Sequence, residues 1–176
     1  MNIRSARIED APVVALVHVR SWQTAYRGLV PQEYLDALEV ARRRVVWISI
    51  VAQTDWPQTG TLVAEREQGV IAFVNVRPTR DDDEDPAHVG EVAAIYALPG
   101  IWGQGVGQGL MAAALDSLAR AGFGQATLWV LDTNTRARRF YEAGGWRTDG
   151  AAKRDDRRGF PLREVRYRRP LPEAPP

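Results

Sequence analysis

Residues 91–109 read EVAAIYALPGIWGQGVGQG, and this stretch decides the fold. Its apolar beginning predicts a buried strand, Pro99 marks a turn, and glycines stand at every second position from 103 to 109. Apolar residues at helical spacing follow at once, namely Leu110, Met111, Ala114, Leu115 and Leu118. A strand, a glycine-rich turn and a helix N-terminus in succession predict an anion site. Backbone N–H groups without intrahelical partners converge there with the positive end of the helix dipole.

The rest of the chain predicts strands and helices on both sides of this stretch. Before it we expect a strand at 2–8, a helix from Asp10 to Gly28, helical residues 31–50, and a hairpin of strands 61–67 and 70–76. After it we expect a helix to about residue 122, a strand at 126–131, a short helix within 133–146, and closing strands at 145–150 and 162–169. The strand at 126–131 should run parallel to the strand at 91–97, because a right-handed helical crossover would join them.

This order of elements predicts an α+β fold. We expect a mixed, mostly antiparallel central sheet flanked by helices, with one βαβ unit that carries the glycine turn, because a doubly wound sheet would alternate strands and helices throughout. The chain has 176 residues, and we expect a single domain at 1–170 followed by a proline-rich tail at 171–176.

The apolar positions within these elements predict which faces are buried. They are Val13, Val14, Val17 and Trp22 in the first helix, Val45, Val46, Trp47 and Ile50 in the second helical region, and Val165 and Tyr167 in the last strand. Residues 81–85 are the acids DDDED, and we expect their mutual repulsion to oppose a packed conformation of this loop.

Composition argues against several classes of function. The balance of 23 basic against 22 acidic residues is too even for a nucleic-acid or membrane-surface protein. There is no cysteine, and His18 and His88 lack a metal-ligand spacing, so we expect no metal site. The only lysine, Lys153, lies in a charged run that is a poor setting for a Schiff base. The charge balance leads us to expect neither a nucleic-acid nor a membrane partner. Because the N-terminus fits neither a signal peptide nor a membrane span, we expect a cytoplasmic protein.

The glycine turn has three interpretations from the residues alone. A phosphate loop of the GxxxxGK[ST] kind is excluded, because no Lys or Ser/Thr follows the glycines. A dinucleotide fingerprint is matched from Gly107 to Ala112, with Asp132 where a ribose-binding acid would lie, so an NAD(P)-binding protein stays an alternative. A glycine-rich connector that binds nothing is the third, although alternate glycines are hard to explain by packing alone.

Two blocks of the sequence carry motifs with a fixed spacing. The first, [RQ]-x-x-G-x-[GA], appears as Gln104-Gly-Val-Gly107-Gln-Gly109 after a strand and a proline. The second, N-x-x-A-x-x-[FL]-Y-x-x-x-G-[FW], appears in register as Asn134, Ala137, Phe140, Tyr141, Gly145 and Trp146. With these two blocks the chain resembles the GNAT superfamily of CoA-dependent N-acyltransferases, and residues 21–38 resemble the first helices of its bacterial members. The resemblance implies a GNAT-like fold whose βαβ unit carries the loop for the CoA pyrophosphate.

The resemblance also implies how acetyl-CoA, as the acyl-donor co-substrate, would be held. Backbone N–H groups of Gln104, Gly105, Val106, Gly107, Gln108 and Gly109 would bind the pyrophosphate. The strand edge from Ile95 to Ala97 would pair with the pantetheine arm, and an N–H near Ile95 would face the thioester carbonyl as the oxyanion donor. Asn134 is expected to bind the pantetheine or its acyl end, while a plain helix cap is its alternative role.

The chemistry implied by the resemblance needs an acid, a base and an acceptor site. Tyr141 is the expected general acid for the leaving thiolate, its alternative being a surface tyrosine. Glu91 is the expected base acting through water, or else a solvated charge at a strand end. Trp22 and Tyr26 could form an aromatic wall for the acceptor, or be core residues. The acids at 81–85 could attract a cationic acceptor, although a solvated loop is the simpler interpretation.

The expected function is therefore an acetyl-CoA-dependent N-acetyltransferase. It would act on a primary amine of a small molecule or peptide by direct attack in a ternary complex. A non-catalytic CoA-binding sensor and, less favoured, an NAD(P)-binding protein are the alternatives. The acceptor, an acyl group larger than acetyl, and a homodimer formed through the terminal strands are left open by the sequence.

Overall fold

A computed structural model describes residues 1–172, so residues 173–176 of the expected tail lie outside the described part. The strands are β1 (Asn2–Ser5), β2 (Gly60–Arg66), β3 (Gly69–Pro78), β4 (Val89–Ala97), β5 (Gln125–Leu131), β6 (Arg147–Asp155) and β7 (Leu162–Pro170). The α-helices are α1 (Ala11–Ala25), α2 (Gln32–Asp36), α3 (Val40–Ala52), α4 (Val106–Arg120) and α5 (Thr135–Ala143), with short 3-10 turns η1 (Ile8–Asp10) and η2 (Pro99–Ile101).

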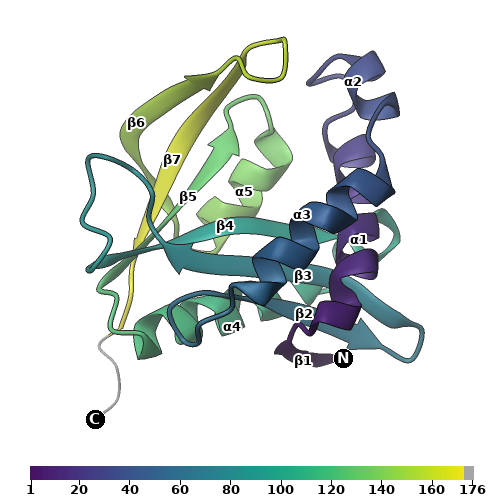
Figure 1. Cartoon of the computed structure of the whole chain (residues 1–176). Coiled ribbons are helices and arrows are strands. Elements are labelled where there is room, and N and C mark those ends of the chain that lie inside the picture. The colour runs from purple at the N-terminus through teal and green to yellow at the C-terminus, as the bar shows by residue number, and fades with distance from the viewer. Residues whose placement is uncertain (173–176) are drawn as a thin grey trace.

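The seven strands form one sheet in the order β1-β2-β3-β4-β5-β7-β6. Only β4 and β5 are parallel, and α4 connects them, which confirms the α+β fold and its single βαβ unit. Helices α1 and α3 lie on one face of the β2–β4 half, and α4 lies on the opposite face (Figure 1). None of the helices among residues 1–172 is both long enough and apolar enough to cross a membrane.

The sheet opens between β4 and β5. These strands pair over residues 89–91 and 125–127 alone, whereas β4 stays paired with β3 along its whole length to Ala97. The β3–β4 register also shifts once, which leaves Ala93 without a partner on β3 as a β-bulge. The second half of β4 therefore has a free edge beside a cleft.

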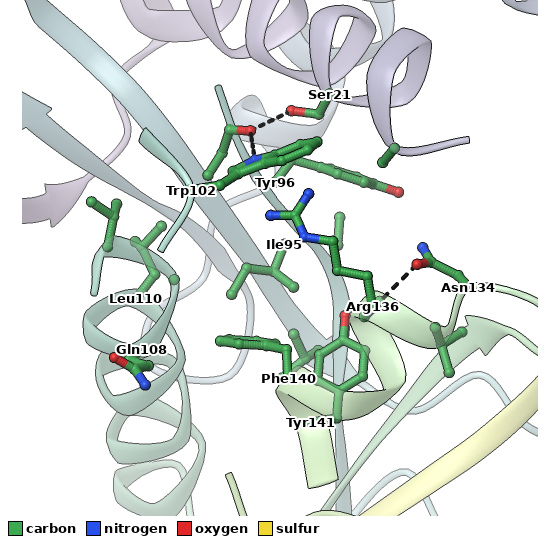
Figure 2. Close-up of a pocket in the computed structure, with 18 of the residues that line it drawn as sticks. Ser21, Ile95, Tyr96, Trp102, Gln108, Leu110, Asn134, Arg136, Phe140 and Tyr141 are labelled. Carbon is green, nitrogen blue, oxygen red and sulfur yellow. Dashed lines mark hydrogen bonds between the residues drawn. The ribbon is translucent and has the colours of Figure 1, made fainter. Parts of the chain in front are cut away.

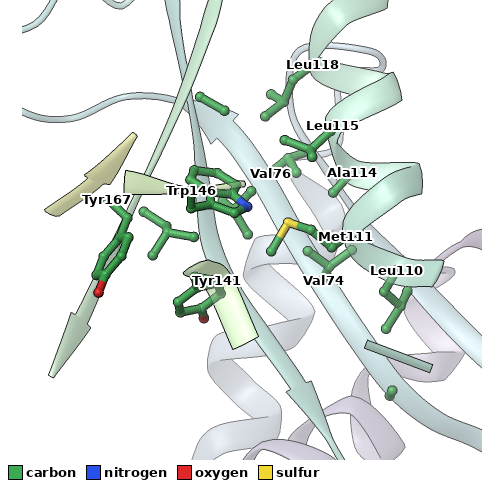
Figure 3. Close-up of a cluster of buried hydrophobic side chains, with 14 of the residues drawn as sticks. Val74, Val76, Leu110, Met111, Ala114, Leu115, Leu118, Tyr141, Trp146 and Tyr167 are labelled. Atoms are coloured by element: carbon green, nitrogen blue, oxygen red, sulfur yellow. The ribbon is translucent and has the colours of Figure 1, made fainter. Parts of the chain in front are cut away.

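The largest apolar core lies between α4 and the sheet. The expected apolar positions of α4 are all buried, and in Figure 3 they cover Val74 and Val76 of β3. This core continues with Tyr141 of α5, Trp146 just before β6, and Tyr167 of β7. A second core joins α1 and α3 to the other face of the sheet, where Val14 and Val17 are fully buried and Trp47 is 2% exposed.

Two apolar positions of α3 were predicted wrongly. Val45 is 66% exposed and Val46 is 45% exposed. The reason is that α3 buries only one narrow face, with Trp47 and Val51 turned to the core, so neighbouring positions point to solvent.

The acidic segment 81–85 is packed in part, which corrects the expectation for two of its residues: the side chains of Asp81 and Glu84 are 17% and 12% exposed, whereas residues 82, 83 and 85 are exposed. Arg166 of β7, whose side chain is 5% exposed, donates to Asp83 at 2.8 Å and to Asp81 at 3.1 Å. The same guanidinium donates to Asp149 of β6 at 2.7 Å, and Arg168 bonds Glu84. The buried Arg166 and the partly buried Arg168 thus neutralise acids that the sequence alone presents as mutually repelling.

Candidate active site

A cleft of about 400 Å³ occupies the opening between β4 and β5. Its wall combines the free edge of β4, the first turn of α4, the start of α5, and the C-terminal end of α1. Segments that are far apart in the sequence thus meet at the place where the sheet separates (Figure 2).

The glycine turn places the start of α4 at one end of this cleft. Gly103 and Gly105 have φ values of 77° and 79°, a left-handed conformation that favours glycine, and Gly105 is the N-cap of α4. The first bond of the helix runs from Gly109 N–H to Gly105 C=O at 3.0 Å. The N–H groups of Val106, Gly107 and Gln108 therefore have no carbonyl to bond within the helix, which makes them a candidate anion site.

Two of the residues expected to hold the pyrophosphate do not line the cleft. The N–H of Gln104 donates to Ile101 C=O, and its side-chain Oε1 accepts from Arg66 at 2.9 Å. Gly109 uses its N–H inside the helix, in the bond to Gly105 C=O, and a Cβ there would meet only the side-chain ends of Met1 and Ile3. The candidate anion site therefore narrows from residues 104–109 to residues 105–108.

The edge of β4 offers backbone groups to the cleft. Leu98 N–H donates to Ile71 C=O, and bonding to β3 alternates along an antiparallel pair, so the backbone groups of Ile95 and Ala97 point away from β3. The C=O of Ala97 already accepts bonds from Trp102 Nε1 at 2.8 Å and Ser21 Oγ at 2.9 Å. Ile95 thus presents both an N–H and a C=O, whereas Ala97 presents its N–H.

Tyr141 reaches the cleft from α5, with its hydroxyl at the wall (Figure 2). Burial raises the pKa of this phenol above its usual value of 10, and proximity to Tyr96 adds to the effect. The hydroxyl is therefore a proton donor throughout the neutral pH range.

Asn134 lies at the start of α5 and lines the same cleft. Its Oδ1 accepts the N–H of Ala137 at 3.1 Å, which is the bond of a helix cap. The amide Nδ2 makes no protein hydrogen bond among the described residues, and it is the group that Asn134 has left for a ligand.

The structure does not bring Glu91 into the cleft wall. Its carboxylate accepts from Arg77 Nε at 2.8 Å, and its backbone lies where β4 still pairs with β5. Within the described residues, the titratable side chains of the wall are the three tyrosines Tyr26, Tyr96 and Tyr141, together with Arg136. The wall therefore contains no carboxylate and no imidazole.

Tyr26 and Trp22 lie at the α1 side of the cleft. Tyr26 lines the wall, and burial raises its pKa well above 10. Trp22 lies behind it, with ring centroids 4.4 Å apart, and is itself absent from the wall. His18 stacks on Trp22 and accepts from Trp47 Nε1 at 3.2 Å; burial lowers its pKa to about 3, so the ring is neutral.

Sequence reasoning missed Ser21, Trp102 and Arg136. Trp102 is the one aromatic residue within the glycine turn, and a large side chain among glycines was the available signal. Arg136 stands at a variable position of the block that starts at Asn134, so the motif gave no signal for it. Asp132, the ribose-binding acid of the dinucleotide alternative, forms an ion pair with Arg163 at 3.0 Å.

The described residues contain no group of three or more side chains suited to hold a metal ion.

Comparisons with known proteins show which family the chain is similar to. The model of the acetyltransferase (GNAT) family matches residues 20–146. The uncharacterized N-acetyltransferase YuaI of Bacillus subtilis is 33% identical over 135 residues, which cover 76% of this chain and 73% of that protein.

Two solved structures share the fold. The PaiA N-acetyltransferase from Thermoplasma acidophilum, in complex with coenzyme A, aligns with a TM-score of 0.74 at 18% identity, covering 97% of this chain and 98% of that one. YncA from Salmonella typhimurium, solved with its cofactor acetyl-CoA, aligns with a TM-score of 0.72 at 17% identity and covers 100% of this chain and 96% of that one.

Proposed function

This chain belongs to the acetyltransferase (GNAT) family and is an N-acetyltransferase, and we propose that it transfers acetyl from acetyl-CoA directly to a primary amine in a ternary complex. The observation that carries the proposal is the free edge of β4 beside the open N-terminus of α4. Acetyl-CoA matches both features, because its extended pantetheine arm can pair with a free strand edge and its diphosphate can bind at a helix N-terminus.

The residues of the cleft fit acetyl-CoA. The N–H groups of residues 106–108 suit a diphosphate, because they are unpaired donors at the positive end of a helix. The N–H and C=O of Ile95 suit the amides of a pantetheine arm. The Nδ2 of Asn134 suits a carbonyl oxygen on the same arm.

The proposed reaction is assisted by a backbone N–H near Ile95 and by the hydroxyl of Tyr141. The amine nitrogen bonds to the carbonyl carbon of the thioester, and the carbon–sulfur bond breaks. An N–H near Ile95, at the bulged part of β4, donates to the carbonyl oxygen as negative charge develops there. Tyr141 gives its hydroxyl proton to the departing sulfur and recovers a proton from solvent.

The amine must lose its own proton by another route. Among the described residues the wall has no carboxylate or imidazole. We propose that water accepts both the proton that the ammonium form loses before attack and the proton that the nitrogen loses after its bond to the carbonyl carbon has formed. Glu91, which is bound to Arg77, then has a structural role in place of the expected role as base. The value of kcat/KM should rise with pH toward the pKa of the amine itself, and Glu91→Gln should keep that profile.

The acceptor is proposed to enter on the α1 side, where Tyr26 and the Trp22 behind it offer an aromatic surface to a small-molecule or peptide amine. The test is thiol release from acetyl-CoA across a panel of primary amines, with the acetylated product identified by its mass. Release that depends on the amine supports the proposal. Binding of acetyl-CoA without release for any amine would favour a sensor, and thermal stabilisation by NAD alone would overturn the assignment of the ligand.

A further inference from the structure

Arg136 spans the cleft from the side opposite the glycine turn. It is the second residue of α5, and its guanidinium carbon lies 3.4 Å from the ring centroid of Trp102. Trp102 belongs to the turn that precedes α4, so this contact joins the two sides of the cleft in front of Ile95 (Figure 2). The side chain thus lies across the region in which the donor would be held.

The guanidinium of Arg136 has no anionic partner among the described residues. No carboxylate lies within ion-pair distance of it, and it donates no hydrogen bond to a protein group. Its neighbour Arg138 differs, because that side chain donates to Tyr167 Oη and to Asp132 C=O, both at 3.0 Å. An unpaired cation at the wall of a ligand cleft indicates an anion that arrives with the ligand.

Trp102 is the fixed member of the stacked pair. Its Nε1 is held by the Ala97 carbonyl at 2.8 Å, and Ser21 bonds the same carbonyl from α1. Arg136, by contrast, is restrained only by the aromatic face. Bonds from a guanidinium to phosphate oxygens are charge-assisted and bidentate, and they are stronger than stacking on a ring at a partly exposed site.

We propose that Arg136 binds the diphosphate of the acyl donor. In the free protein the guanidinium rests on Trp102; when the donor enters, it leaves the ring and donates to the diphosphate held at residues 105–108. The inference rests on the proposed use of acetyl-CoA. It adds a side-chain cation to a phosphate site that otherwise consists of backbone N–H groups, because Gln104 is turned to Arg66.

The test compares ligands that differ in their phosphates. Dissociation constants are measured calorimetrically for CoA and for dephospho-CoA, which keeps the diphosphate and lacks the 3′-phosphate. Arg136→Gln should weaken both about ten- to hundredfold, as expected for loss of a charged hydrogen bond. Arg136→Lys should recover part of the loss, since it restores the charge without the bidentate geometry. Arg139→Gln on the same helix, outside the cleft wall, is the matched control and should bind as wild type.

A donor without any phosphate completes the test. S-Acetylpantetheine carries no phosphate, and its kcat/KM can be measured without saturating the enzyme. This kcat/KM should be the same for wild type and Arg136→Gln. An equal loss with S-acetylpantetheine would overturn the proposal, because Arg136 would then act through the shape of the cleft. A loss with CoA but not with dephospho-CoA would also overturn it, because the partner would be the 3′-phosphate. Binding of CoA by the wild type tests the premise separately, because a wild type that does not bind CoA would overturn the proposed use of acetyl-CoA, whereas equal binding by wild type and Arg136→Gln would overturn the role of Arg136 alone.

Discussion

The Oδ1 atom of Asn134 accepts the backbone N–H of Ala137 at 3.1 Å, so one side chain caps α5 while its Nδ2 stays available to the cleft. The sequence had presented these two roles as alternatives. The structure shows the cap and leaves Nδ2 without a protein hydrogen bond among the described residues, so the cap and the proposed binding role can be separated by mutation.

Asn134→Ser should keep the helix cap and lose the hydrogen-bond donor Nδ2. Serine is as good an N-cap as asparagine, so the free energy of unfolding should stay within about 0.5 kcal/mol of wild type. The dissociation constant for acetyl-CoA should rise about two- to tenfold, for one lost neutral hydrogen bond. Asn134→Ala should show the same loss of affinity and lose about 1 kcal/mol of stability as well. If Asn134→Ser bound acetyl-CoA as tightly as the wild type, Nδ2 of Asn134 would have no part in binding the acyl donor.

Gly105 and Gly109 provide a matched pair within the glycine turn. Gly105→Ala places a Cβ on a residue with φ of 79° at the N-cap of α4, a strain of about 1–2 kcal/mol that is relieved only by moving the loop. Its affinity for acetyl-CoA should fall. Gly109→Ala meets only the flexible end of Met1 at 3.1 Å and gains helix propensity, so its affinity should be that of wild type. Equal losses in the two variants, measured by titration with acetyl-CoA, would contradict the narrowed site.

The buried Arg166 should make stability depend on pH. Its hydrogen bond lowers the pKa of Asp83; for Asp149, burial opposes the shift, yet bonds from Ala151 N–H and Arg166 still lower the pKa. A carboxyl group whose pKa is lower in the folded than in the unfolded protein stabilises the fold at pH values above its unfolded-state pKa, which is near 4. This contribution is lost as the pH falls through the pKa of the folded state. Arg166→Gln should therefore cost about 3 kcal/mol at pH 7, and the difference from wild type should shrink below pH 4.

Urea unfolding of both proteins at pH 7 and pH 3.5 measures this difference. Arg163→Gln, on the same strand but with a side chain 68% exposed, is the control and should cost less than about 1 kcal/mol. A difference that stays constant across this pH range would mean that Arg166 contributes through packing alone.

Local signals were sufficient to predict the order of elements. The Gln68-Gly69 turn, the apolar spacing of α4 and the crossover from β4 to β5 were all confirmed, because each depends on residues close together in the sequence. The burial of Arg166 was not predicted, and Val45 was predicted to be buried but is exposed. Both depend on which distant element packs against the residue, and periodicity does not carry that information.

The candidate site was predictable where a motif specifies the backbone. The open N-terminus of α4 and the free edge around Ile95 followed from the two sequence blocks. The roles of single side chains did not, because Glu91 forms an ion pair with a residue of β3 and Arg136 reaches the cleft only once α5 is placed beside Trp102. Such contacts join segments that the sequence separates by more than ten residues.

The general-acid role of Tyr141 is the central chemical claim. The raised pKa keeps the phenol protonated at neutral pH, so it should impose no fall in kcat below about pH 10. General acid catalysis contributes about a hundredfold or more. The decisive measurement is kcat, with an amine that the wild type accepts, together with the dissociation constant for acetyl-CoA, in wild type and Tyr141→Phe. We predict a loss in kcat of about a hundredfold with affinity within about twofold, whereas an unchanged kcat would contradict the account.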